Sequence, residues 1–176
     1  MGRKTWSPPV FTGRMHEEIA ADCLIPVEKA DLTAQDELTG SDASLLICDD
    51  PLKIWTAESG RASILIDMKQ VRQIAGVSHY PFPVLRHLLG GRPESRILAE
   101  FPSEYRISVS TDSETFTECA HGVFRVFGGE EIIGFEPCEA RYVRLEILST
   151  VGAASGLPAY REVPLSIGEI TIYSPN

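Results

Sequence analysis

Apolar and polar residues alternate along most of the chain after residue 23. In Tyr105–Ser110 and Arg141–Ile147 almost every second residue is apolar, which is typical of strands with one buried face. The pattern therefore predicts an all-β protein, a sandwich or barrel. The expected strands are Leu24–Val27, Leu45–Cys48, Ser63–Met68, Arg72–Tyr80, Tyr105–Ser110, Thr115–Cys119, Val123–Phe127, Glu131–Phe135, Arg141–Leu148 and Glu169–Tyr173.

Turn-forming residues separate these strands, as in Thr111–Glu114 and at the Gly128–Gly129 pair. A short turn around Val84–Leu89 is the one helical segment that the pattern supports. Two connections are long, Pro81–Pro102 and Ser149–Leu165. Long loops in compact domains tend to carry binding functions, so these are the first places to expect a site, and tolerated insertions are the alternative.

The length of 176 residues suits one domain. Residues 1–22 are polar and aperiodic and are interpreted as an extension or linker, and residues 23–176 as the domain. The formal net charge of -9 disfavours nucleic acid and acidic membranes, because binding to either depends on clustered basic residues. Apolar stretches such as Ile64–Ile66 are far shorter than the roughly 20 residues of a membrane span, so no membrane insertion is expected.

The four cysteines, Cys23, Cys48, Cys119 and Cys138, have no metal-type spacing. Buried free thiols are the favoured interpretation, and a disulfide stays open. The basic first residues lack the apolar core of a signal peptide, which leaves a cytosolic protein or a mature fragment of a larger one. The only asparagine is Asn176, so there is no N-glycosylation sequon and no interior asparagine side chain to bind a ligand.

Five segments of the chain stand in a characteristic order: Ile64–Met68, Ile74–Val77, Tyr105–Thr117, Ala140–Leu145 and Ile167–Tyr173. From about Thr33 onward this order resembles the discoidin or coagulation-factor type C domain, whose galactose-binding-like jelly-roll β-sandwich is shared by family 32 carbohydrate-binding modules. The resemblance implies this fold over roughly 140 residues and a ligand-binding function. Arg141 and Arg144 are expected to make framework salt bridges.

Members of this family often hold a structural calcium ion at an acidic turn that ends in tryptophan. Here Asp50 and Trp55 match that turn, but Lys53 stands where a hydroxyl ligand is usual. Calcium requires six to eight oxygen ligands, and an ammonium group would repel it. We therefore expect Lys53 to replace the ion between Asp50 and Glu169. The chain is expected to have no cofactor, with structural calcium disfavoured.

In sugar-binding relatives the ligand lies on loops at one end of the sandwich, against an aromatic ring. The corresponding strand end here contains His79, Tyr80 and Phe82, with phenylalanine where the family frequently has arginine. Stacking rings and charged donors are the groups that such a site needs. Packing in the strand or core is the alternative for His79 and Phe82. The remaining candidates, which could supply the missing donors, are Arg86, His87, Tyr160 and Arg161.

Motifs for catalysis are absent from the sequence: there is no nucleophile elbow, phosphate loop or zinc-binding helix. A Cys119–His121 thiol–imidazole pair is conceivable, but ordinary strand packing is the better interpretation. The leading hypothesis is a non-catalytic carbohydrate-binding module that binds a glycan and serves a parent glycoside hydrolase. Its location would be extracellular or periplasmic if that enzyme is secreted. The alternative is a protein-interaction domain that uses Tyr80, Phe82 and Leu85 as an apolar patch.

Overall fold

The computed structural model describes residues 24–48, 50, 53–80, 98–125 and 130–176. Its elements, in chain order, are β1 (Leu24–Pro26), the 3-10 helix η2 (Lys29–Asp31), β2 (Thr33–Asp36), the 3-10 helix η3 (Ala43–Ile47), β3 (Trp55–Ala57), β4 (Ala62–Tyr80), β5 (Pro102–Ser110), β6 (Thr117–Val123), β7 (Glu131–Thr150), α3 (Val151–Ala154), the 3-10 helix η4 (Pro158–Tyr160), β8 (Leu165–Ile167) and β9 (Glu169–Pro175).

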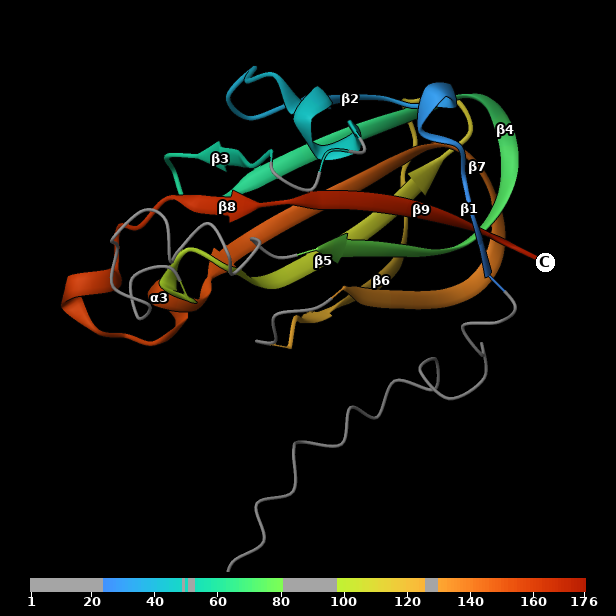
Figure 1. The fold of residues 1–176 in the computed structure, drawn as a ribbon. Coiled ribbons are helices and arrows are strands. Elements are labelled where there is room, and N and C mark those ends of the chain that lie inside the picture. The colour runs from blue at the N-terminus through green and yellow to red at the C-terminus, as the bar shows by residue number, and fades with distance from the viewer. Residues whose placement is uncertain (1–23, 49, 51–52, 81–97, 126–129) are drawn as a thin grey trace, which may run out of the picture.

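The strands form two packed layers, which Figure 1 shows from the side. One layer contains β2, the first half of β4, the second half of β7, β5 and β6; the other contains β1, β9, the second half of β4 and the first half of β7. All pairings among these strands are antiparallel. A small β3–β8 sheet lies beside them. The predicted all-β sandwich is therefore confirmed.

Both long strands, β4 and β7, bend and pass from one layer to the other (Figure 1). The bend in β4 falls between Asp67 and Arg72, where the pairing register with β7 shifts. Lys69 adopts a positive φ of 62° there, and its backbone N–H donates to Asp67 Oδ1 at 2.7 Å. Two strands that the sequence predicts separately, Ser63–Met68 and Arg72–Tyr80, are thus one continuous strand.

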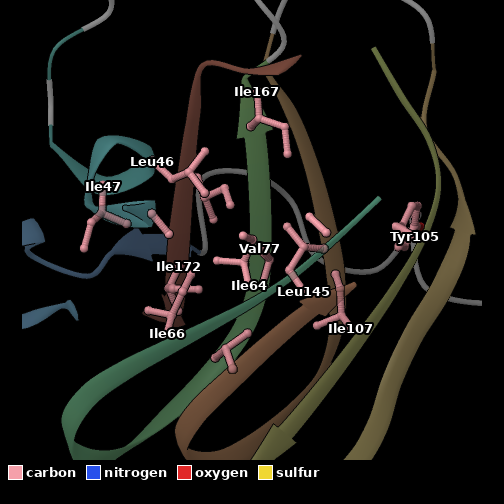
Figure 2. Packing of buried hydrophobic residues seen from close by; sticks show 14 of the residues in the cluster. Leu46, Ile47, Ile64, Ile66, Val77, Tyr105, Ile107, Leu145, Ile167 and Ile172 are labelled. Carbon is pink, nitrogen blue, oxygen red and sulfur yellow. The ribbon is translucent and has the colours of Figure 1, made fainter. Parts of the chain in front are cut away.

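The core fills the space between the layers with apolar side chains from both (Figure 2). Ile64 from β4, Leu145 from β7 and Ile172 from β9 are completely buried. Their burial follows from the period-two alternation, because every second side chain of each strand points inward. Each side chain of this size contributes roughly 1.5–3 kcal/mol when it is removed from water. The sandwich therefore has the core that the alternation predicts.

One predicted strand is wrong: Leu45–Cys48 lies in η3 and the residue that follows it. Asp42 begins this helix, because its side chain accepts a hydrogen bond from the Ser44 N–H at 3.0 Å. Ala43, Leu46 and Ile47 are buried at helical spacing. A short apolar run fits a buried helical turn as well as a strand, and the cap decides between them.

Other boundaries also differ from expectation. The predicted Thr115–Cys119 strand and the start of Val123–Phe127 form the single strand β6, and Glu131–Phe135 joins Arg141–Leu148 in β7. The connection Ser149–Leu165 contains α3 and η4. The extension at residues 1–22 and the turn at Val84–Leu89 lie outside the described residues. No helix in the described part of the chain is long and apolar enough to cross a membrane.

Candidate functional site

A pocket of about 390 Å³ lies on the outer face of β4 and β9, beside Tyr80. Ser78 and Tyr80 point into it from β4, and Thr171 and Tyr173 from β9. The neighbouring residues Val77, Ile170 and Ile172 belong to the core. The same alternation that fills the core therefore places hydroxyl-bearing side chains on the outside. The remaining lining residues are Pro26, Val27, Glu28, Lys29, Glu130 and Glu169.

Strand register brings these side chains together. Ser78 lies opposite Thr171, and Tyr80, the last residue of β4, lies opposite Glu169. The backbone N–H of Gly168 donates to the Tyr80 carbonyl at 3.0 Å, which extends the ladder to the strand end. The pocket floor is thus part of a hydrogen-bonded sheet, so its polar groups are held in fixed positions.

Glu130 is the acceptor at one side of the pocket. Its Oε1 accepts hydrogen bonds from the Tyr173 hydroxyl at 2.6 Å and from the Ser78 hydroxyl. Burial and the bond to Glu130 raise the pKa of Tyr173 to about 12. The Tyr173 phenol therefore stays protonated: its O–H donates to Glu130, and its oxygen can accept a hydrogen bond from a ligand.

Lys29 stands at the other side of the pocket. Its Nζ lies 2.8 Å from Glu169 Oε1 and 2.6 Å from the carbonyl oxygen of Ile170, with the Thr171 hydroxyl at 3.3 Å. An ammonium group has three donors, so these three contacts fix its position. Lys29 was not among the predicted site residues, because its partners lie about 140 residues away along the chain.

The two carboxylates of the predicted Lys53 site have different lysine partners. Lys53 Nζ lies 3.9 Å from Asp50 Oδ2, whereas Lys29 Nζ pairs with Glu169. Lys53 thus contacts Asp50 but is not the ion-pair partner of Glu169, and its replacement of a calcium ion stays a prediction. Among the described residues no group of three or more His, Cys, Asp and Glu side chains is arranged to hold a metal.

His79 does not reach the pocket. Its exposed fraction is 3%, and its ring packs edge-on against Phe124, with the ring centroids 4.0 Å apart. Like Val77, it points inward from β4. Burial lowers the pKa of His79 to about 4. The packed-residue alternative therefore describes His79, and its assignment to a surface ligand site is corrected.

The other predicted site residues fall in three places. Tyr80 lines the pocket. Tyr160 ends η4 and Arg161 follows it, exposed, and neither lines the pocket. Phe82, Arg86 and His87 lie outside the described residues, as does Leu85 of the alternative apolar patch. The structure thus brings Tyr80 together with residues of β9 and η2 that sequence reasoning missed.

Two further expectations concern charged and reactive pairs. Arg141 pairs with Asp67 and Arg144 with Glu37, each through two guanidinium nitrogens, so the predicted framework salt bridges are confirmed.

His121 Nδ1 lies 2.7 Å from Glu118 Oε1. The side chain of His121 is 75% exposed, and the Cys119 sulfur faces Cys138 instead. Cys119 thus packs against the core while His121 is exposed and faces Glu118, and the two do not form a thiol–imidazole pair.

The strand pairings define an antiparallel β-sandwich of the jelly-roll type, and the pocket lies on its outer face. Residues 31–162 match the model of the F5/8 type C domain family, so the chain belongs to that family, and the resemblance stated from the sequence is confirmed. No curated protein sequence matches the chain.

Solved structures similar to this chain include three modules from Clostridium perfringens. CpGH89CBM32-5, in complex with GalNAc-beta-1,3-galactose, has a TM-score of 0.63 at 17% identity over 84% of this chain and 99% of its own. The family 32 module of NanJ, in complex with galactose, has a TM-score of 0.63 at 15% identity over 86% of this chain and 99% of its own. CBM32-3 from a family 31 glycoside hydrolase has a TM-score of 0.63 at 22% identity, covering 85% and 94%. These likenesses establish the shared fold.

Proposed function

We propose that this chain is a non-catalytic carbohydrate-binding domain and that the pocket beside Tyr80 is part of its glycan-binding surface. The observation that carries the proposal is the pocket itself. It combines two tyrosine side chains and hydroxyl groups on the outer face of β4 and β9 with the carboxylates of Glu130 and Glu169 and the ammonium group of Lys29. Membership of the F5/8 type C family and the sugar-bound modules of the same fold support the ligand class.

The chemistry of the pocket suits a sugar ring. Tyr80 is half-buried at the strand end, so an accessible part of its ring is available to the apolar C–H face of a pyranose. Glu130 and Glu169 carry acceptor oxygens for sugar hydroxyls, and Thr171 offers both a donor and an acceptor. Sites of this kind combine apolar contact area with a few fixed polar groups.

A glycan array of the purified chain tests the proposal, followed by titration calorimetry with the best ligand. We expect Tyr80→Ala and Glu130→Gln each to weaken binding by about tenfold or more, which corresponds to about 1.4 kcal/mol. Tyr142→Ala is the matched control, because Tyr142 lines a separate hollow on the outer face of the other layer. Circular dichroism establishes that each variant is folded.

A blank array from folded protein would overturn the carbohydrate proposal and leave the protein-interaction hypothesis. Binding that survives Tyr80→Ala and Glu130→Gln would retain the ligand class but remove this pocket from the site. The predicted loop residues Phe82, Arg86 and His87 would then be the next to replace.

The partner proposal is that the domain serves a glycoside hydrolase, in an extracellular or periplasmic setting, by keeping the enzyme near its glycan. Such tethering raises the effective concentration of the enzyme on a surface without any new catalytic contact. One of the similar modules is itself described as part of a family 31 glycoside hydrolase. Immunodetection of the chain in secreted and cytoplasmic fractions of its source tests the location, and a purely cytoplasmic signal would refute it.

A further inference from the structure

Two cysteine side chains from different layers meet at the edge of the sandwich. The sulfur atoms of Cys119 on β6 and Cys138 on β7 lie 3.8 Å apart. Both side chains are half-buried and pack against the core. Cys48, the other cysteine in the described part of the chain, lies elsewhere and donates from its sulfur to the carbonyl oxygen of Leu45.

The strands that carry the pair are not hydrogen-bonded neighbours. β6 is an edge strand of the seven-stranded sheet and pairs with β5. Cys138 lies in the first half of β7, opposite Ile74 of β4, in the other layer. A covalent bond between the two sulfurs would therefore join the layers at an edge that backbone hydrogen bonds do not connect.

Local backbone geometry favours the approach of the sulfurs. In the β5–β6 ladder Ile107 lies opposite Ala120 and Ser108 opposite Glu118, so Cys119 is the extra residue of a β-bulge. A bulged residue is released from regular pairing, and bulges re-aim side chains. The sulfurs have to close by about 1.8 Å to reach the disulfide bond length of about 2.0 Å.

We propose that Cys119 and Cys138 are a site of intramolecular disulfide formation, which clamps the β6 edge to the opposite layer when the chain meets a small-molecule disulfide oxidant. The proposal does not rest on the carbohydrate function. It assigns the disulfide to one pair among the four cysteines, and Cys48 takes no part in it.

The two thiols have unequal roles in the exchange. The hydrogen bond that the two sulfur atoms share lowers the pKa of Cys138 and raises that of Cys119. The Cys138 thiolate attacks one sulfur of the oxidant, whose S–S bond breaks and releases one small thiolate. Cys119 then loses its proton to solvent and attacks the Cys138 sulfur of the mixed disulfide, releasing the second small thiolate. The two thiolates take up the two protons, so two protein thiols are oxidised and one small disulfide is reduced to two thiols.

The test uses the full chain, reduced, desalted and then incubated with oxidised glutathione. We expect a mass loss of about 2 Da, from the two hydrogens removed, and a non-reduced tryptic digest in which Ile107–Arg125 is linked to Val126–Arg141. The melting temperature of the oxidised protein should rise by roughly 6–12 °C, because the bond closes a loop of about twenty residues in the unfolded chain.

Matched variants separate this pair from the other cysteines. Cys119→Ser and Cys138→Ser should each abolish the linked peptides and the rise in melting temperature. The Cys23→Ser/Cys48→Ser double variant keeps the pair and should retain both. Two free thiols in the oxidised double variant, measured with Ellman's reagent, would overturn the proposed site. A linked pair with a lowered melting temperature would overturn the clamping role.

Discussion

Acidification should weaken the folded state through His79, because the burial of its ring outweighs the Tyr80 backbone and the Glu130 charge, which favour the protonated form. Its ring lies against Phe124, and within the part of the chain that the structure describes neither ring nitrogen makes a hydrogen bond of ordinary geometry. Burial lowers the pKa of His79 from 6.5 to about 4. The unfolded chain, in which the ring is solvated, therefore binds a proton at a pH where the folded chain does not.

The sign and size of the effect follow from linkage. The stability that depends on neutral His79 is fully present above pH 6.5 and is lost as the pH falls toward 4, the folded-state value. The complete loss is about 3 kcal/mol, since each tenfold change in proton affinity corresponds to about 1.4 kcal/mol. About 2 kcal/mol of it should be lost between about pH 7 and about pH 5.

Urea unfolding at these two pH values measures the effect, with wild type compared with His79→Phe. The variant replaces the titrating ring by an apolar one, so we expect it to lose less free energy of unfolding than wild type over the same interval. His121→Phe is the control, because the His121 side chain is 75% exposed. Equal losses in wild type and His79→Phe would refute the reasoning, because His79 would then carry none of the pH dependence.

Four further substitutions have expected outcomes. Gly152→Ala should lower the free energy of unfolding by roughly 1–3 kcal/mol in urea titrations, because the added Cβ meets neighbouring atoms at 2.8–2.9 Å. The Cβ added by Gly156→Ala meets no atom within 4 Å, so this variant should lose only the roughly 1 kcal/mol that a positive φ costs alanine. Ile64→Ala should cost roughly 2–5 kcal/mol by leaving a cavity in the core, and a smaller loss would mean that the layers collapse around it. Arg144→Leu should raise the pKa of Glu37, which the Arg144 guanidinium now lowers; an unchanged carboxyl titration by NMR would contradict that assignment.

The sequence predicted the sandwich because inward-pointing residues recur at every second position over long stretches. The same rule also carried information on His79: Val77 is a core residue two positions earlier on β4, so His79 shares its inward face. The predicted site nevertheless included the imidazole as a surface ligand, with packing in the strand as the alternative. The orientation of Tyr80 toward the outside follows from the same alternation.

Two features of the molecule had no local signal. Lys29 reaches Glu169 across about 140 residues of chain, and such a pair depends on the final register of β1 and β9. The continuity of β4 depends on Lys69 taking a positive φ, which a side chain other than glycine adopts only rarely. Alternation alone therefore predicted two strands where the chain forms one, and it could not place the charged groups around the pocket.

The passage of β4 and β7 between the layers bears on how the molecule opens in solution. Because each of these strands contributes hydrogen bonds to both layers, one layer cannot detach while the other keeps its full ladder. Amide protons in the two halves of β4 should consequently exchange with deuterium at similar slow rates, as members of one cooperative unit. The short β3–β8 pair shares no such strand, and its amides should exchange earlier, by local opening that leaves the sandwich intact.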